Sequence, residues 1–226
     1  MAASHAPGVV GQVREANGPD MIASERRSHW QNLYLDKGEE QVSWTQLDPQ
    51  PSLGLIEKFA RDRNASIVDI GGGASRLADA LLARGFTAIT VLDLAEAALQ
   101  STKSRLGERG ASVQWVAADV TKWRPSQAFD IWHDRAAFHF LIDSGDRAAY
   151  IDCLQAGVKP GGHAIIATFA PDGPEKCSGL PVQRYDPESL SATIGNAFDL
   201  IEHQSHRHVT PWGAAQSFQF SVLRRR

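Results

Sequence analysis

Hydrophobic and polar positions along the chain alternate between two patterns. Short runs of Val, Ile, Leu and Phe are typical of buried β-strands, and five of them are separated by segments of helical length. The predicted strands are Ser66–Ile70, Thr87–Leu92, Val113–Val116, Phe129–His133 and His163–Phe169. The predicted helices are Ser75–Arg84, Ala95–Arg109, Asp146–Val158 and Pro187–Ile194. This alternation predicts a parallel sheet with right-handed crossovers and helices on both faces.

The last two apolar runs depart from this alternation. Leu200–Val209 and Ser217–Leu223 are separated by the short segment Thr210–Gly213, which has no room for a crossover helix. A hairpin is therefore expected, and it adds an antiparallel strand to the sheet.

The first fifty residues differ in composition from the rest. Residues 1–24 are rich in Ala, Gly and Pro and predict a flexible arm. Trp30, Tyr34 and Trp44 then follow within fifteen residues, and Trp30 and Tyr34 have helical spacing. Ser52 is the predicted N-cap of a further helix. We therefore expect residues 1–51 to form an arm and an aromatic lid, and residues 52–226 to form a single α/β domain.

Three consecutive glycines, Gly71, Gly72 and Gly73, follow the first predicted strand and precede a helix. Ligands of open parallel sheets bind at this carboxyl edge, and glycine lets the backbone approach a ligand closely. A tight turn without a ligand is the alternative, although three glycines exceed what a turn needs. The loop therefore predicts a binding site.

Acidic residues follow the next two strands. Asp93 lies where a carboxylate can accept both hydroxyl hydrogens of a ribose, and Asp119 suits an exocyclic amine such as that of adenine. Taken singly, Asp93 could cap the next helix and Asp119 could belong to a turn before Thr121. Their occurrence at consecutive strand ends favours a nucleoside site.

Two residues distinguish between possible nucleotides. A dinucleotide fingerprint requires a small residue where this chain has Arg76. Asp69 would repel a pyrophosphate but attract a sulfonium and an amino group. The sequence thus favours S-adenosylmethionine over NAD.

Five segments in order resemble class I S-adenosylmethionine-dependent methyltransferases. They are Val68–Gly73, Leu92–Leu94, Ala118–Val120, Phe129–Asp134 and Lys159–Gly162. The resemblance implies a Rossmann-like, doubly wound sheet of seven strands whose last strand is antiparallel. It also implies an N-terminal segment that closes over the cofactor.

The resemblance also assigns residues to parts of the cofactor. It implies that Gly71 and Gly73 face the methionine, Asp93 the ribose, and Asp119 with Val120 the adenine. The full set of expected cofactor-binding residues is Trp44, Asp69, Gly71, Gly72, Gly73, Asp93, Leu94, Asp119, Val120 and His133.

The segment after the fourth strand holds the candidate catalytic residues His133, Asp134 and His139. Methyl transfer requires a positioned nucleophile, and a base when a proton must leave. A histidine can accept that proton near neutral pH. Alternatively, His133 is only a pocket wall and His139 is a core residue. Members of the family that methylate amino groups often carry an Asn/Asp-Pro-Pro-aromatic motif at this place. Its absence here argues against a nucleic-acid base or a side-chain amide as the acceptor.

Composition and charge limit the classes of partner that we expect the protein to bind. The chain has 226 residues, a formal net charge of −3 and two cysteines, Cys153 and Cys177. We therefore expect no nucleic-acid partner and no membrane association. We expect a cytoplasmic location. His206 and His208 share a strand face, but no third metal ligand is visible and no metal is expected. The number of subunits is left open.

We thus predict a methyltransferase that acts on a small-molecule nucleophile, such as a thiol or another soft acceptor. A protein-lysine methyltransferase is the alternative, and an acidic groove near the transferred methyl would favour it, whereas a closed aromatic pocket would favour a small molecule. A more remote alternative is an NAD(P)-dependent oxidoreductase, which is disfavoured because this sequence lacks a Tyr-x-x-x-Lys pair. Another is a protein that binds the cofactor without catalysis.

Overall fold

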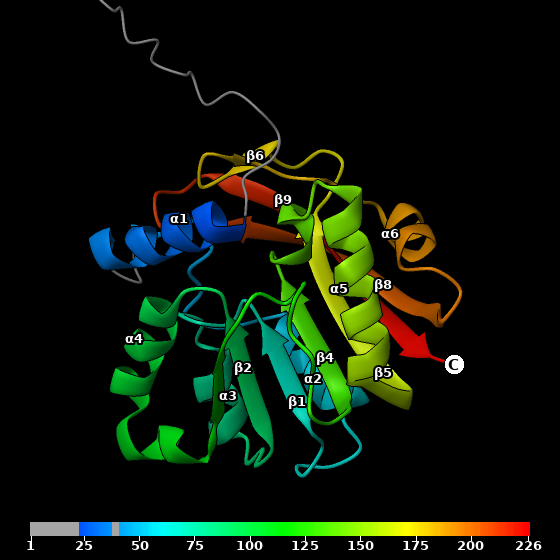
Figure 1. Ribbon diagram of the computed structural model, residues 1–226, viewed down its shortest axis with the longest axis horizontal. Helices are drawn as coiled ribbons and strands as arrows, with labels where there is room; N and C mark the ends of the chain where they lie inside the picture. The colour runs from blue at the N-terminus through cyan, green and yellow to red at the C-terminus, as the bar shows by residue number, and fades with distance from the viewer. Residues whose placement is uncertain (1–22, 38–40) are drawn as a thin grey trace, which may run out of the picture.

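The computed structural model describes residues 23–37 and 41–226, so the predicted flexible arm lies almost entirely outside the described residues. Seven strands form one sheet in the order β3-β2-β1-β4-β5-β9-β8 (Figure 1). Their bounds, in that order, are Gln114–Ala117, Ile89–Asp93, Ile67–Ile70, Phe129–Arg135, Val158–Phe169, Ala215–Arg225 and Phe198–Val209. Pairing is parallel from β3 to β5 and antiparallel from β5 through β9 to β8. The predicted doubly wound sheet with an antiparallel last strand is confirmed.

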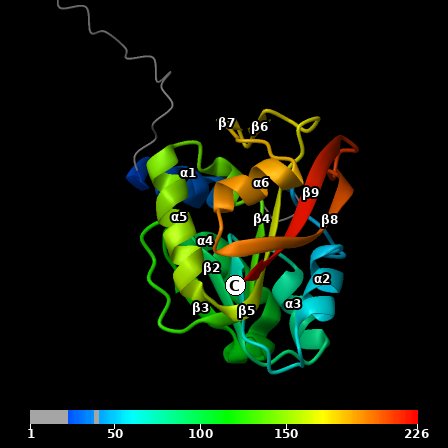
Figure 2. The same ribbon diagram turned by 90° about the vertical axis from the view of Figure 1, so that its right-hand side faces the viewer.

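Helices cover both faces of this sheet (Figure 2). They are α1 (Ala23–Asp36), α2 (Ser52–Phe59), α3 (Leu77–Ala83), α4 (Glu96–Leu106), α5 (Ser144–Gly157) and α6 (Pro187–Ile194), with short 3₁₀ helices η2 (Gly107–Ser112) and η3 (Phe138–Phe140). None of the described helices is both long and apolar enough to cross a membrane.

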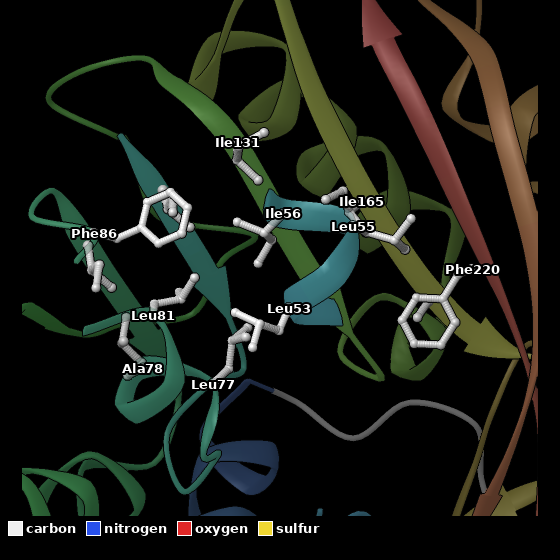
Figure 3. Close-up of a cluster of buried hydrophobic side chains, with 14 of the residues drawn as sticks. Leu53, Leu55, Ile56, Leu77, Ala78, Leu81, Phe86, Ile131, Ile165 and Phe220 are labelled. Carbon is white, nitrogen blue, oxygen red and sulfur yellow. The ribbon is translucent and has the colours of Figure 1, made fainter. Parts of the chain in front are cut away.

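Two hydrophobic cores lie on opposite faces of the sheet, because successive side chains of a strand point to opposite sides. On β4, Ile131 packs with α2 and α3 in the first core, which Figure 3 shows, while Trp132 packs with α5 and α6 in the second. Both side chains are fully buried. Burial on both faces explains why the parallel strands of the sequence are almost continuously apolar.

Some boundaries differ from the prediction. Strand β5 begins at Val158, five residues before the predicted start, and therefore includes the Lys159–Gly162 segment. Helix α4 ends at Leu106 because Gly107 has a φ of 55°, a conformation that does not continue a helix. The long loop after β5 contains a small hairpin of β6 (Lys176–Cys177) and β7 (Leu180–Pro181).

The predicted N-cap at Ser52 is wrong. Pro51 occupies the N-cap position of α2 and makes no side-chain cap bond, while Ser52 is the first residue of the helix. The Ser52 hydroxyl is instead hydrogen-bonded to a side chain of the site described below.

Candidate active site

The carboxyl ends of β1 to β4 lie at one edge of the sheet because their registers match. Ile70 lies opposite both Leu92 and Asp134, and Asp93 lies opposite Ala117. Two adjoining pockets open at this edge, with about 670 and 840 Å³ of open volume. We call them the glycine-loop pocket and the aromatic pocket. Both are lined by Tyr34, Trp44, Gly71 and Arg135, so they form one continuous site.

The three glycines do not have the same role. Gly71 has a φ of 69° and lines both pockets. Gly72 lines the glycine-loop pocket, and a Cβ there would lie 2.2 Å from Asp69 Oδ2. Gly73 lines neither pocket, and its Cβ would lie 2.6 Å from Asp93 Oδ2. The third glycine is therefore needed for packing against Asp93, and nothing in the pocket lining places it against a ligand.

Asp93 is buried at the end of β2 and lines the aromatic pocket together with Leu94. Its carboxylate accepts hydrogen bonds from the backbone N–H groups of Gly73 (3.0 Å) and Ala95 (2.8 Å). Burial nevertheless raises the pKa of Asp93 to about 6, and these backbone bonds oppose the rise. The carboxylate fixes the glycine loop relative to α4 and still borders the pocket.

Asp119 and Val120 line the aromatic pocket after β3. Asp119 Oδ1 accepts hydrogen bonds from the N–H (3.0 Å) and the hydroxyl (2.7 Å) of Thr121, so the residue does form the expected turn. Its Oδ2 is buried without a hydrogen-bond partner and lies 3.7 Å from Arg26 of α1. One carboxylate oxygen thus shapes the turn while the other has spare capacity to accept a bond.

His133 belongs to a buried chain of hydrogen bonds in the glycine-loop pocket. Its Nδ1 lies 2.7 Å from Asp69 Oδ1, and its Nε2 lies 2.8 Å from the Ser52 hydroxyl. Ser52, Asp69 and His133 all line this pocket. Because a carboxylate only accepts, Nδ1–H donates to Asp69 and the hydroxyl of Ser52 donates to Nε2. Asp69 Oδ2 is buried and has no hydrogen-bond partner.

Asp134 is fully buried and lines neither pocket. It accepts hydrogen bonds from the N–H groups of Ala137 (2.9 Å) and Phe138 (3.1 Å) and from the Tyr150 hydroxyl (2.7 Å). Burial raises its pKa to about 6. These bonds hold the turn after β4, where Ala136 has a φ of 68°. The geometry supports a positioning role for the residue that the sequence proposed as catalytic.

His139 is also buried outside both pockets. Its Nδ1 accepts a hydrogen bond from the Phe169 N–H (3.3 Å), and Nε2 is buried without a partner. Burial, and then the charge of Arg135, lowers the pKa of His139 to about 3. The imidazole is therefore neutral at physiological pH and contributes to the core beneath the site.

Aromatic rings form one wall of the aromatic pocket. Trp30 and Tyr34 come from α1, Trp44 from the following segment and Phe140 from η3. The Trp30 ring makes edge contacts with Phe140 (5.0 Å between centroids) and Trp44 (5.8 Å). The predicted helical spacing in the aromatic segment thus brings these side chains over the strand ends.

Arg135 and Cys177 complete the aromatic pocket. Arg135 donates from Nη1 to the Trp44 carbonyl (3.0 Å), and burial lowers its pKa to about 10, so it stays charged. Burial raises the pKa of the Cys177 thiol to about 11. A thiol with that pKa is protonated near neutral pH and is a poor nucleophile.

Three of the polar and aromatic residues on which the proposals below depend were not identified from the sequence. They are Ser52, Arg135 and Phe140. Ser52 meets its partner His133 across 81 positions of the chain, which leaves no local signal. Arg135 directly follows the proposed catalytic residues His133 and Asp134, and a cation at a strand end beside them is a signal that could have identified it.

Comparisons with known proteins bear on the fold and on the segment that carries most of this site. Residues 67–162, which include β1 to β4 and the glycine loop, match the family model described as a methyltransferase domain. Over 114 residues the chain is 24% identical to nodulation protein S of Rhizobium tropici, a match that covers 50% of this chain and 47% of that protein. The chain thus spans about half the length of this curated relative.

Solved structures share the fold. One is 1,6-didemethyltoxoflavin-N1-methyltransferase of Burkholderia thailandensis, with bound substrate and S-adenosylhomocysteine, at 20% identity, a TM-score of 0.67 and coverage of 93% of both chains. Another is the N-methyltransferase NodS of Bradyrhizobium japonicum with S-adenosylhomocysteine, at 16% identity, a TM-score of 0.61 and coverage of 88% of this chain and 98% of that one. The family-model match and the shared fold support the predicted resemblance to class I S-adenosylmethionine-dependent methyltransferases.

Proposed function

We propose that this class I methyltransferase transfers a methyl group from S-adenosylmethionine to a small-molecule nucleophile held in the aromatic pocket. One observation carries the proposal: a continuous site runs from the glycine loop past Asp93 and Asp119 and is walled by Trp30, Trp44 and Phe140. It lies in and around the segment that matches the methyltransferase family model.

The residues at the strand ends suit this cofactor. Asp69 Oδ2 and Asp119 Oδ2 are buried acceptors without hydrogen-bond partners, and a buried polar atom without a partner costs free energy. The α-amino group and the adenine amine of the cofactor are donors that would satisfy them. In this arrangement Gly71 and Gly72 border the methionine, Asp93 accepts from the ribose hydroxyls, and Leu94 and Val120 flank the nucleoside.

The chemistry of the transfer assigns clear tasks to the protein. When bound, S-adenosylmethionine would supply a sulfonium methyl group that an in-line nucleophile attacks, with S-adenosylhomocysteine as the leaving group. The chain must hold that nucleophile in line and exclude water. The aromatic wall fits both tasks, since it is apolar and closes over the strand ends. We propose that residues 1–51 include this lid and that residues 52–226 form the methyltransferase domain.

His133 is the candidate base for acceptors that must lose a proton. Its Nε2 is engaged by the Ser52 hydroxyl, so it can accept a proton from that hydroxyl, which in turn accepts one from the nucleophile. Asp69 then stabilises the imidazolium through Nδ1–H. This relay adds Ser52 to the machinery, while Asp134 and His139 support the turn and core around it.

The walls of the pocket favour a small molecule over a protein lysine. Acidic side chains lie at the β2 and β3 ends, whereas the rest of the aromatic pocket carries aromatic and aliphatic side chains together with Arg26 and Arg135. The cationic side chain of a lysine substrate would make no favourable electrostatic interaction with Arg135. Related structures concern an N1-methyltransferase of didemethyltoxoflavin and the conversion of a disulfide bond into a thioacetal during echinomycin biosynthesis, which supports small acceptors. A cytoplasmic location remains a prediction from composition.

The proposal is tested by measuring S-adenosylhomocysteine released with panels of thiols, phenols, amines, carboxylic acids and a cell extract. Isothermal calorimetry with S-adenosylhomocysteine and NADH provides the cofactor control. We expect binding of the adenosyl ligand and release with at least one small molecule. Binding of NADH alone would contradict the cofactor assignment, and turnover only with the protein fraction of the extract would favour a protein substrate.

A further inference from the structure

Arg135 contributes a guanidinium group to the point where the two pockets meet. It is the last residue of β4, and its Nη1 donates to the Trp44 carbonyl. The guanidinium also lies over the Phe218 ring of β9, 4.9 Å from its centroid. Its Nε and Nη2 are screened from solvent and have no hydrogen-bond partner.

This cation has no counter-ion in the part of the chain that the structure describes. The groups that it affects electrostatically are His139, His206, His208 and Cys177, none of which is anionic near neutral pH, together with Asp69. Asp69 is hydrogen-bonded to His133 and forms no ion pair with Arg135. A buried charge without a partner is costly, and an anion in the pocket would offset that cost.

The two unpartnered atoms specify the shape of that anion. Nε–H and Nη2–H form one edge of the planar guanidinium and point the same way, which matches the two oxygens of a carboxylate. The remaining edge is partly occupied, because Nη1 bonds Trp44. Position also matters: Arg135 and Phe218 lie on the β4–β5–β9 side of the glycine loop, whereas Asp93 and Asp119 follow β2 and β3 on the other side.

We propose that Arg135 binds a carboxylate of the methyl acceptor, so that the acceptor is a small organic acid whose apolar part lies against Trp30, Trp44 and Phe140. This assignment rests on the proposed methyltransferase function and specifies its substrate class. A carboxylate held at Arg135 positions the rest of the acceptor between the glycine loop and the aromatic wall, where the methyl group is delivered.

The test compares two probes of the same size, 4-mercaptobenzoate and 4-mercaptobenzamide, which differ in the carboxylate. Binding is measured by calorimetry with and without saturating S-adenosylhomocysteine. For the unmodified protein we expect the acid to bind about tenfold more tightly or better, as a charge-assisted hydrogen bond supplies. In Arg135→Met this preference should fall to about twofold or less. In Arg135→Lys, which retains the charge but loses the two parallel N–H donors of the guanidinium, the preference should be intermediate.

Arg63→Met is the matched control, because the Arg63 guanidinium also lies over an aromatic ring, 4.6 Å from the Phe86 centroid, but it lines neither pocket and pairs with Glu57. It should leave the acid-to-amide ratio unchanged. Equal binding of the two probes by the unmodified protein, or an unchanged ratio in Arg135→Met, overturns the proposal.

A cofactor arm separates the two sources of a carboxylate. If Arg135→Met weakens the binding of S-adenosylhomocysteine but not that of 5′-methylthioadenosine, which has no carboxylate, then Arg135 binds the cofactor carboxylate and the acceptor assignment is wrong. Failure of the methyltransferase function has a different signature, since the unmodified protein would then bind neither adenosyl ligand, whatever the probe ratio.

Discussion

The β1–β3 end of the site differs in construction from the aromatic end that we propose to hold the methyl acceptor, which we call the acceptor end. At the β1–β3 end, Asp69 and Asp93 belong to the ends of β1 and β2, and Asp119 follows β3. Asp93 and Asp119 accept from nearby backbone N–H groups and from Thr121, and Asp69 accepts from His133 of the adjoining strand. The acceptor end joins Trp30, Trp44, Phe140 and Cys177 from four separate segments, with contacts between side chains. Substitutions should therefore affect cofactor affinity at one end and acceptor recognition or rate at the other.

The largest effect is expected at His133, which lies between the two ends. His133→Asn retains a donor that can reach Asp69 but removes the group that accepts from Ser52. If the Ser52–His133 relay moves the acceptor proton, kcat should fall about hundredfold, the scale of general base catalysis. Affinity for S-adenosylhomocysteine should stay within about threefold. Stopped assays with an identified acceptor and calorimetry measure the two quantities. Equal losses in both would make His133 only a pocket wall.

Asp93→Ala should produce the clearest defect at the β1–β3 end. It removes the acceptor of the Gly73 and Ala95 N–H groups as well as the proposed ribose contact. Hydrogen bonds to a charged group contribute about 1.5–3 kcal/mol, so affinity for S-adenosylhomocysteine should fall tenfold or more. Asp199→Ala is the control, because Asp199 pairs with Arg226 on an exposed surface. Unchanged affinity in Asp93→Ala would refute the ribose role.

The sequence predicted the β1–β3 end well because its signals are local. A strand, a glycine loop and an acid at each next strand end occur in fixed order, and parallel pairing must bring them together. The sequence could not predict that Gly73 packs against Asp93 and lines neither pocket, because Asp93 lies 20 residues further along the chain. The sequence also predicted Ser52 as an N-cap, because the hydrogen bond between its hydroxyl and His133 forms only in the folded chain.

The acceptor end was predictable only in part. Trp30 and Tyr34 showed helical spacing, but nothing in the local pattern placed them against Phe140, which lies over a hundred residues further on. His139 illustrates the same limit. A histidine near a strand end resembles a catalytic base in sequence, and only its burial and its bond to the Phe169 N–H distinguish a core residue.

Acidification should weaken the β1–β3 end specifically. Burial raises the pKa of Asp93 to about 6, so the folded protein takes up a proton there as the pH falls through 6, while the unfolded chain does so near 3.8. Protonation favours the folded state on acidification, since this pKa is raised, but it removes the anion that accepts from the ribose hydroxyls. Affinity for S-adenosylhomocysteine should therefore decline several-fold between about pH 7.5 and pH 5 by calorimetry. An Asp93→Asn variant that declines just as steeply would assign the effect to another group.

The smallest effect is expected from the aromatic wall. Phe140→Ala removes a ring that lines the aromatic pocket and contacts Trp30 but borders no residue proposed to hold the nucleoside directly. Loss of an aromatic contact beyond its buried area amounts to about 0.5–1.5 kcal/mol. KM for an acceptor should therefore rise a few-fold to about tenfold with kcat and S-adenosylhomocysteine affinity little changed. Phe140→Leu, which retains an apolar side chain, should recover part of the loss. A fall in cofactor affinity as large as the rise in KM would show that the two ends are not separable, and that the wall closes over the cofactor as much as over the acceptor.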